Sequence, residues 1–333
     1  MAFPFKNCSS ILLFSGEAED GPDPNFFHLS GADVDGAILV WTQKGQTLIT
    51  SKMNAAGAAA QFSGRVLAPD WKDIGSTIKS LVPAGKVGLD LRSLSARRYV
   101  RMGQLLCAKR LVDAGEQLDN LRRVKKPQQI AKIAKAVKIS KQILDELELK
   151  PSMTELDVVK ALNLACAKRG TSFAFPPIVA AGPASREPHH IPGPRKLGRG
   201  IVLIDFGAQY QHLNADLSRC YFLGPCPEEK KKYEEAQQIH DSILDEMPSL
   251  HTGGQLARFA DAQCKKMGWG RMIHAIGHGL GLEVHDPPHL SLASKDKLQN
   301  NVVLAIEPGW YGKKFGVRYE NNVVWGRKKA RLL

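Results

Sequence analysis

The amino-acid sequence predicts a two-domain protein, with a smaller α/β domain over residues 1–122 and a larger α+β domain over residues 123–333. The chain has 333 residues, which is about twice the usual domain length. Hydrophobic residues make up 43% and charged residues 24%, an ordinary composition for a globular chain with a sizeable core. Short strand patterns alternate with helices in the first third, whereas long helical stripes and hairpin-forming strands fill the rest.

In the first domain, short apolar segments bounded by turn residues predict strands that alternate with helices. The predicted strands cover residues 11–14, 37–41, 47–50 and 87–91. Catalytic residue types do not gather here, so this domain is interpreted as a scaffold or recognition domain. The boundary falls at residues 122–127, where Pro127 suits a helix start because its missing N–H needs no partner there.

The second domain combines helices with strands that form hairpins. Four helices are predicted, with starts at or just after Pro127, Ser152, Pro227 and Thr252. Glu155 lies three residues after Ser152 and predicts a capping box for the second helix, which ends at Gly170. The apolar stripe of that helix is Leu156, Val159, Leu162 and Cys166. Strands are predicted over residues 200–208, 216–222, 302–306 and 316–325.

The formal net charge is +13, which could attract nucleic acid. The basic residues form short, separate clusters, however, and a solvated basic surface is the preferred interpretation. No apolar run approaches the ~18 residues of a membrane helix, and the apolar block at residues 11–14 is too short for a signal peptide. Six cysteines without a CxxC pair are expected to be reduced. These features predict a cytoplasmic protein without a membrane or nucleic-acid partner.

Two aspartates mark the first candidate site. Asp205 closes the apolar segment GIVLID, and Asp216 opens another apolar strand shortly after it. The polar segment between them is turn-sized, so a hairpin would set the two carboxylates side by side. Either aspartate alone could be a strand-end cap with a hydrogen-bond donor as partner. Two adjacent carboxylates repel unless they share a proton or a metal, and metal binding is the preferred interpretation of the pair.

A histidine between glycines is the second candidate site. His278 lies in the segment IGHGLG, whose glycines let the backbone approach a metal or ligand closely. A phosphate-cradling loop is a weaker interpretation, because no strand leads into a GxGxxG pattern and no P-loop lysine is present. A second imidazole, His285, follows in the segment EVHD.

Two glutamates complete the set. Glu307 closes the apolar strand VVLAIEPG, and Glu320 lies within VRYEN. Four carboxylates and the His278 imidazole suit a pair of divalent cations such as Mn²⁺, Co²⁺ or Zn²⁺. They do not suit a metal that requires thiolate ligands. Without that positive charge, four ionised carboxylates in one place would repel one another strongly.

The blocks DFG, NAD, GHGLGLEVHD, IEPG and VRYEN resemble the signature blocks of the pita-bread metallopeptidases. This family includes Xaa-Pro dipeptidases (prolidases), Xaa-Pro aminopeptidases and methionine aminopeptidases, with creatinase as a metal-free relative. The resemblance covers most of residues 125–326, with the five ligands in the family's order. Residues 1–120 resemble, more loosely, the N-terminal domain of creatinase and the proline-directed branch. The resemblance implies a pita-bread catalytic domain with two divalent metal ions, Mn²⁺ or Co²⁺, with Zn²⁺ as a third option.

The resemblance also implies a role for each ligand. Asp205 would chelate one metal and Asp216 would bridge both. His278 and Glu307 would hold the second metal, and Glu320 would bridge again.

The resemblance further implies three catalytic residues, His189, His285 and Glu307. Glu307 would accept the proton of the attacking water and pass it to the leaving proline nitrogen. The two histidines would steady the scissile carbonyl and its developing oxyanion. His190 is adjacent to His189 and competes with it for the first position; His189 is preferred.

This chain departs from the prolidase pattern after the EVHD block. Prolidases often carry an arginine there to hold the carboxylate of the dipeptide, whereas this chain has His289, which lacks arginine's fixed charge and bidentate fork. Arg318 in VRYEN is the second predicted substrate-binding residue. Asn321 stands where the family usually has an acid. An Xaa-Pro dipeptidase is the leading prediction, and an Xaa-Pro aminopeptidase for longer peptides is the alternative.

One alternative comes from another class of protein. Some pita-bread domains are metal-free modules that bind nucleic acid or protein, and the net charge of +13 is compatible with such a role. The crowded carboxylates argue against it, because a binding module has no need of them. The resemblance implies small peptide substrates with proline in the second position, and a homodimer.

Overall fold

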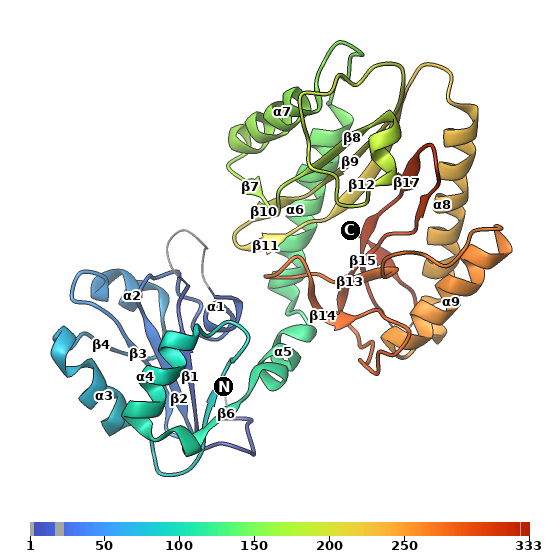
Figure 1. Ribbon diagram of the computed structural model, residues 1–333. Helices are drawn as coiled ribbons and strands as arrows, with labels where there is room; N and C mark the ends of the chain where they lie inside the picture. Colours follow the sequence, from blue (N-terminus) through green and yellow to red (C-terminus); the bar gives the residue numbers. More distant parts are fainter. Residues whose placement is uncertain (1–2, 17–22, 327) are drawn as a thin grey trace. The chain divides into compact units, whose positions relative to one another are not determined.

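The computed structural model describes residues 3–16, 23–326 and 328–333. The chain folds as two compact units, Met1–Arg122 and Arg123–Leu333. Figure 1 shows the first unit in blue to teal and the second in green to red.

The N-terminal unit contains a six-stranded mixed sheet with the strand order β4-β3-β2-β1-β5-β6. Strand β1 pairs antiparallel with β2 and parallel with β5. The strands are β1 (Ser10–Phe14), β2 (Ile38–Thr42), β3 (Gly45–Ile49), β4 (Arg65–Leu67), β5 (Val87–Leu89) and β6 (Leu111–Asp113). The predicted strands of this domain are therefore confirmed, with shifts of one or two residues at their ends.

Helices cover both faces of this sheet because successive side chains of each strand point to opposite sides. Ile11 and Leu13 of β1 pack in one core with Phe26, whereas Leu12 packs in a second core with Ile78. The first core is covered by α1 (Pro24–Ser30), α2 (Ala55–Gln61) and α5 (Gly115–Arg123), and the second by α3 (Ile74–Leu81) and α4 (Ala96–Leu106).

The C-terminal unit contains two main antiparallel sheets. The first has the order β12-β9-β8, from Leu217–Leu223, Gly200–Phe206 and Ile178–Ala181. The second has the order β14-β13-β15-β18-β19, from Asp286–His289, Gly277–Gly279, Val303–Ile306, Asn321–Val324 and Arg331–Leu332. Smaller sheets are formed by β7 (Ser172–Phe173), β10 (Ala208–Tyr210) and β11 (Leu213–Asn214), and by β16 (Gly309–Tyr311) and β17 (Gly316–Arg318).

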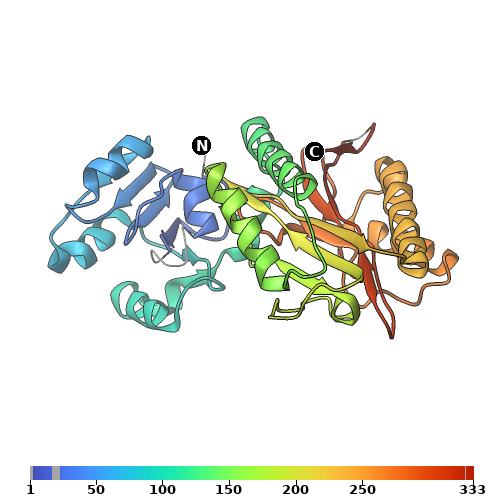
Figure 2. The same ribbon diagram turned by 90° about the horizontal axis from the view of Figure 1, so that it is seen from above.

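Long helices lie outside these strands, as Figure 2 shows for α6 and α7 in green and for α8 and α9 in gold and orange. Their bounds are Pro127–Asp145, Glu155–Lys168, Pro227–Glu246 and Gly253–Lys266. Val158 of α7 packs on Val202 and Ile204 of β9 in one core. Ile239 of α8 packs with Leu304 of β15 in another. Among the described residues, no helix is long and apolar enough to cross a membrane.

The second helix of this unit begins later than predicted. Its N-cap is Thr154, whose hydroxyl accepts the N–H of Asp157 while the Asp157 carboxylate accepts the Thr154 N–H. The predicted cap at Ser152 is therefore wrong. Glu155 is fully buried and instead accepts the backbone N–H groups of Ala181, at the end of β8, and of Gly193. The predicted apolar stripe is wrong at Leu156, which is 40% exposed.

The strand predicted over residues 316–325 is divided in two. It forms β17 and β18, which belong to different sheets and are separated by Tyr319 and Glu320. The backbone N–H of Glu320 donates to the Ser218 carbonyl of β12 at 3.3 Å. The break places the Glu320 side chain in the cavity between the strands.

Candidate metal centre

All of the predicted site residues line one cavity of about 740 Å³ in the C-terminal unit. These residues are His189, Asp205, Asp216, His278, His285, His289, Glu307, Arg318 and Glu320. Apolar side chains, among them Phe175, Ile178 and Val284, form other parts of the wall. Segments up to about 130 residues apart in the sequence therefore contribute to a single site.

Strand alternation places Asp205 in the cavity. On β9, Val202 and Ile204 belong to the core under α6 and α7, so Asp205 projects from the opposite face. Strand β12 pairs with β9 in the register that sets Ser218 opposite Asp205. Gly207 is required next to this hairpin, because a Cβ there would lie 1.7 Å from the Ala215 carbonyl oxygen.

Three of the predicted ligands come together most closely. Asp216, His278 and Glu320 each offer a ligand atom, and these atoms lie within 4.8 Å of one another. His278 Nε2 is 3.5 Å from Asp216 Oδ2 and 3.8 Å from Glu307 Oε1. Gly277 permits this placement of His278, since a Cβ at Gly277 would lie 2.0 Å from the Ala305 carbonyl oxygen.

The carboxylates of the cavity are poorly neutralised by the protein itself. Burial and repulsion from Glu320 raise the pKa of Asp216 well above its ordinary value. Burial raises the pKa of Glu307 to about 8, and burial together with repulsion from Asp205 raises the pKa of Glu320. Among the described lining residues, Arg318 is the one Lys or Arg side chain. Four acidic side chains of the cavity therefore face a single guanidinium among the described lining residues.

The residues present fit divalent metal ions. Asp205 Oδ1 and Asp216 Oδ1 are buried and have no hydrogen-bond partner among the described residues, although buried carboxylate oxygens ordinarily have one. Burial lowers the pKa of His278 to about 4, so its imidazole is neutral and able to act as a ligand at neutral pH. Carboxylate oxygens and imidazole nitrogen are ligand types of Mn²⁺, Co²⁺ and Zn²⁺ sites.

Arg318 is engaged with the acids of the site. The guanidinium donates to Asp205 Oδ2 at 2.6 Å, to the Tyr311 hydroxyl at 2.7 Å and to Ser218 Oγ at 2.8 Å. Ser218 Oγ in turn donates to Glu320 Oε2 at 2.9 Å. Arg318 is only 3% exposed, so its main role in this structure is to orient the carboxylates.

The structure separates the two neighbouring histidines. His189 lines the cavity. His190 Nε2 lies 2.9 Å from the Glu155 carboxylate, which also accepts the N–H groups of Ala181 and Gly193. His190 is thus bound to the scaffold, and the loop is held so that His189 is the one in the cavity.

The remaining predicted residues lie around the same site. The rings of His278 and His285 are 4.2 Å apart at their centroids, and burial lowers the pKa of His285. Strand β14 pairs with β13 in the register that sets His289 opposite His278. His289 is exposed at the edge of the cavity.

Sequence reasoning missed His274 and Tyr311. His274 Nε2 lies 3.1 Å from the Tyr311 hydroxyl, and His274 Nδ1 lies 3.7 Å from Glu307 Oε2. Burial lowers the pKa of His274 to about 4. Its position four residues before His278 was the available signal, because His274 lies in the segment that leads directly into β13, the strand that holds His278.

Comparison with known proteins adds independent information. The model of metallopeptidase family M24 matches residues 131–326, and that of the creatinase/prolidase N-terminal domain matches residues 6–124. An Xaa-Pro dipeptidase from Pyrococcus horikoshii is 27% identical over 320 residues, covering 93% of this chain and 90% of that protein.

Two solved structures resemble the whole chain. The X-Pro aminopeptidase from Thermotoga maritima superposes with a TM-score of 0.85 at 26% identity, over 98% of this chain and 95% of that one. The prolidase from Pyrococcus horikoshii superposes with a TM-score of 0.87 at 25% identity, over 98% of this chain and 93% of that one.

Proposed function

The chain belongs to metallopeptidase family M24, and we propose that it is a metal-dependent Xaa-Pro dipeptidase. The predicted family resemblance and the predicted pita-bread fold class with its smaller N-terminal domain are thereby confirmed. The observation that carries the proposal is the group of ligand atoms from Asp216, His278 and Glu320 within 4.8 Å, in a cavity where the acidic side chains outnumber the cationic ones.

The proposed ligands are the five residues predicted from the sequence. Asp205 would hold one metal, His278 and Glu307 the other, and Asp216 and Glu320 would bridge them. Support comes from the partnerless oxygens of Asp205 and Asp216, and from the raised pKa values of the buried acids. Mn²⁺ or Co²⁺ is proposed as the native metal, with Zn²⁺ as the third option.

Bound divalent cations polarise a scissile carbonyl and lower the pKa of an attacking water. Glu307 is proposed to accept the proton of that water and to deliver it to the leaving proline nitrogen. His189 and His285 are proposed to donate hydrogen bonds to the carbonyl oxygen as negative charge develops on it. Because proline's amide has no N–H, recognition is proposed to rest on the shape of the cavity instead.

Dipeptides are proposed as the main substrates. The relative from Pyrococcus horikoshii that matches nearly the full chain is an Xaa-Pro dipeptidase. His289 at the cavity edge and Arg318 within it are the predicted contacts of the substrate's carboxylate. The buried Arg318 is largely taken up by Asp205 and Tyr311, so His289 carries more of this role.

The decisive experiment measures release of free leucine from dipeptides. The protein would be stripped with a chelator, reloaded separately with Mn²⁺, Co²⁺ or Zn²⁺, and assayed on Leu-Pro and on Leu-Ala as the control without proline. We expect Leu-Pro cleavage that disappears with the chelator and returns with at least one metal. Turnover that is indifferent to the chelator, or a metal-stripped protein that binds RNA and never hydrolyses Leu-Pro, would overturn the proposal.

A homodimer and a cytoplasmic location are further proposals that rest on the sequence. Light scattering coupled to size-exclusion chromatography would test the first. A mass of about 73 kDa, twice the 36.5 kDa of the chain, is expected.

A further inference from the structure

The N-terminal unit contains a cavity of its own, with a volume of about 510 Å³. It lies on the face of the sheet that α3 and α4 cover, and the described residues that line it all belong to this unit. The volume is within the range of sites for small-molecule ligands. A recognition role for this domain would therefore have a place for a ligand.

Apolar side chains form one part of the wall. Phe14 at the end of β1 and Ile38 at the start of β2 line the cavity from the sheet, and Met102 and Leu105 line it from α4. Gly75 lets α3 approach α4 closely, since a Cβ at Gly75 would lie 3.2 Å from Leu105 Cδ1. This surface favours a ligand with an apolar body, because contact with it removes apolar area from water.

Cationic side chains line the same cavity. Lys72, Lys79 of α3 and Arg101 of α4 are exposed, and none of these side chains forms an ion pair or hydrogen bond within the described part of the chain. Arg98 is a fourth cation, and its guanidinium lies 5.5 Å from the centroid of the Phe14 ring. Lysine and arginine are charged at neutral pH, so the charges of Lys72, Lys79 and Arg101 are available to a ligand.

Among the described residues that line this cavity, none is an acid. Helix α3 carries Lys79 and no acid, and helix α4 carries three arginines and no acid. Asp70 and Asp73 precede α3 in the sequence, but neither lines the cavity. The Asp70 carboxylate pairs with Lys52 at 2.6 Å. The charge of the cavity therefore favours an anionic ligand.

Trp71 adds a large aromatic surface to this cavity. Its side chain is 83% exposed and makes no contact with another ring or with a cation in the described part of the chain. An exposed indole ring beside cationic side chains is a platform on which a planar ring can stack. The ligand that matches the cavity therefore combines an aromatic ring with a negative charge.

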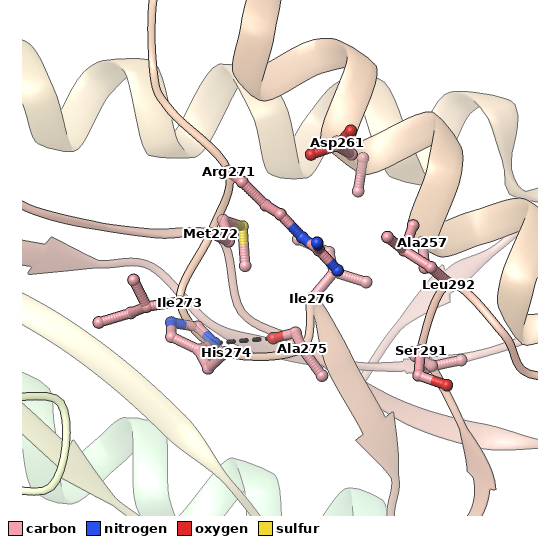
Figure 3. A pocket seen from close by; sticks show the side chains of 12 residues that line it. Ala257, Asp261, Arg271, Met272, Ile273, His274, Ala275, Ile276, Ser291 and Leu292 are labelled. Atoms are coloured by element: carbon pink, nitrogen blue, oxygen red, sulfur yellow. Dashed lines mark hydrogen bonds between the residues drawn. The ribbon is translucent and has the colours of Figure 1, made fainter.

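A cavity beside the metal centre has a different character. The cavity in Figure 3 shares His274 and Leu290 with the metal centre, so it belongs to the site already described. Its wall carries Arg271 and Asp261, which have charges of opposite sign. The cavity of the N-terminal unit shares no lining residue with the metal centre, and its charged lining residues are all cationic.

We propose that the cavity between α3 and α4 binds a nucleoside monophosphate. The base stacks on Trp71, and the phosphate, which carries most of two negative charges at neutral pH, accepts hydrogen bonds from the lysines and from Arg101. The apolar wall packs against the remaining face of the base. This site is separate from the proposed peptidase activity and does not depend on it.

The test titrates AMP into the metal-loaded full chain and measures the heat of binding. Adenosine, which lacks the phosphate, and ribose 5-phosphate, which lacks the base, are the matched ligands. Each should bind about tenfold or more weakly than AMP, because each loses either the charge-assisted hydrogen bonds or the stacking contact. Added salt should weaken the binding of AMP more than the binding of adenosine.

Variants assign the binding to this cavity. Trp71→Ala and Arg101→Ala should each weaken AMP binding about tenfold, and Trp71→Phe should restore part of the loss because it keeps a ring. Arg97→Ala is the matched control, since Arg97 is an exposed arginine of α4 that does not line the cavity. It should change AMP binding less than about twofold. Leu-Pro turnover and the melting temperature should be unchanged in all four variants.

Several results would overturn the proposal. The first is an absence of binding heat at millimolar AMP. The second is AMP binding that Asp216→Asn removes and Trp71→Ala leaves unchanged, which would place AMP at the metal centre instead. The third is single-stranded oligoadenylate that binds far more tightly than AMP, which would make RNA the ligand. Because heat is measured without turnover, failure of Leu-Pro cleavage would overturn the proposed function and leave this site standing.

Discussion

Buried carboxylates in the N-terminal unit are matched by guanidinium groups, whereas those around the C-terminal cavity outnumber the cations beside them. In the first unit, Asp119 lies 2.7 Å from Arg92 Nη2 and 3.1 Å from Arg122 Nη2. Burial alone would raise the pKa of Asp119, but the hydrogen bonds from these arginines outweigh it, and the net effect is a lowered pKa.

In the second unit, the pKa values of buried acids shift in the opposite direction. Burial and mutual repulsion raise the pKa values of Asp216, Glu307 and Glu320. Arg318 is the one Lys or Arg among the described residues of that cavity, and it is bonded to Asp205. An aspartate paired with guanidinium groups is a structural element, whereas a cluster in which acidic side chains outnumber cations is suited to bind metal. The number of cationic side chains next to the buried acids distinguishes the paired aspartate from the candidate metal centre.

The largest expected effect comes from changing a bridging acid. Asp216→Asn or Glu320→Gln should lower kcat/KM for Leu-Pro by at least about a thousandfold, or about 4 kcal/mol, since both proposed metals lose a ligand. Calorimetric titration with Mn²⁺ and steady-state kinetics would measure this. The exposed Asp145 at the end of α6 offers a control, and Asp145→Asn should change neither quantity. Full activity in Asp216→Asn would contradict the ligand assignment.

The next effect tests the N-terminal unit. Asp119→Asn should destabilise the protein by about 3 kcal/mol, because the buried Arg122 loses a carboxylate partner. In the metal-free protein, Asp216→Asn should have the opposite sign and raise the melting temperature, since it relieves repulsion. Thermal denaturation after chelation would compare them. If both variants were destabilised equally, the proposed difference between the two units would not hold.

A smaller effect is expected from pH on the metal-free protein. Glu307 has a pKa of about 8 when folded against an ordinary value of 4.5, so between pH 6.5 and 8 the folded state holds a proton that the unfolded state has lost. Stability must therefore fall as pH rises through this window, by about 1–2 kcal/mol or several degrees in Tm.

Histidines should not mask this trend. Burial lowers the pKa values of His274, His278 and His285, so their contributions to stability change below pH 6.5. Denaturation scans from pH 6.5 to 8, with chelator and with saturating Mn²⁺, would measure the dependence. Metal should abolish it, because metal-bound carboxylates stay ionised. A metal-free protein whose Tm increased over this range would contradict the assigned charge excess.

The smallest effect adds a cation at the cavity edge. His289→Arg should lower KM for Leu-Pro about three- to tenfold, because the guanidinium offers a fixed charge and two hydrogen bonds to the dipeptide carboxylate. Leu-Pro-amide, which lacks that carboxylate, is the matched substrate control. An unchanged KM for Leu-Pro would show that His289 does not face the substrate's carboxylate.

The candidate site was largely predictable because its residues carry local signatures. Asp205 and Glu307 each follow an apolar strand, and His278 is flanked by glycines that permit close packing. The end of an apolar strand and a flanking glycine can each be recognised from a few adjacent residues. The structure brings these residues into one cavity, as the carboxylate-repulsion argument anticipated.

Details that depend on distant contacts were not predictable in this way. The choice between His189 and His190 depends on Glu155, whose buried carboxylate lies 2.9 Å from His190. The role of Arg318 depends on Asp205, 113 residues earlier in the chain. Local periodicity contains no information about which polar groups meet after packing.

The sequence by itself determined the secondary structure of most core elements, the identity of the acids and imidazoles that line the cavity, and their excess of acidic over basic side chains. Only the tertiary structure decided which of His189 and His190 enters the cavity, and that the Arg318 guanidinium bonds to the Asp205 carboxylate. The physical reason is that strand and helix patterns follow from neighbouring residues, whereas hydrogen-bond partners and cavities arise only when distant segments are packed together.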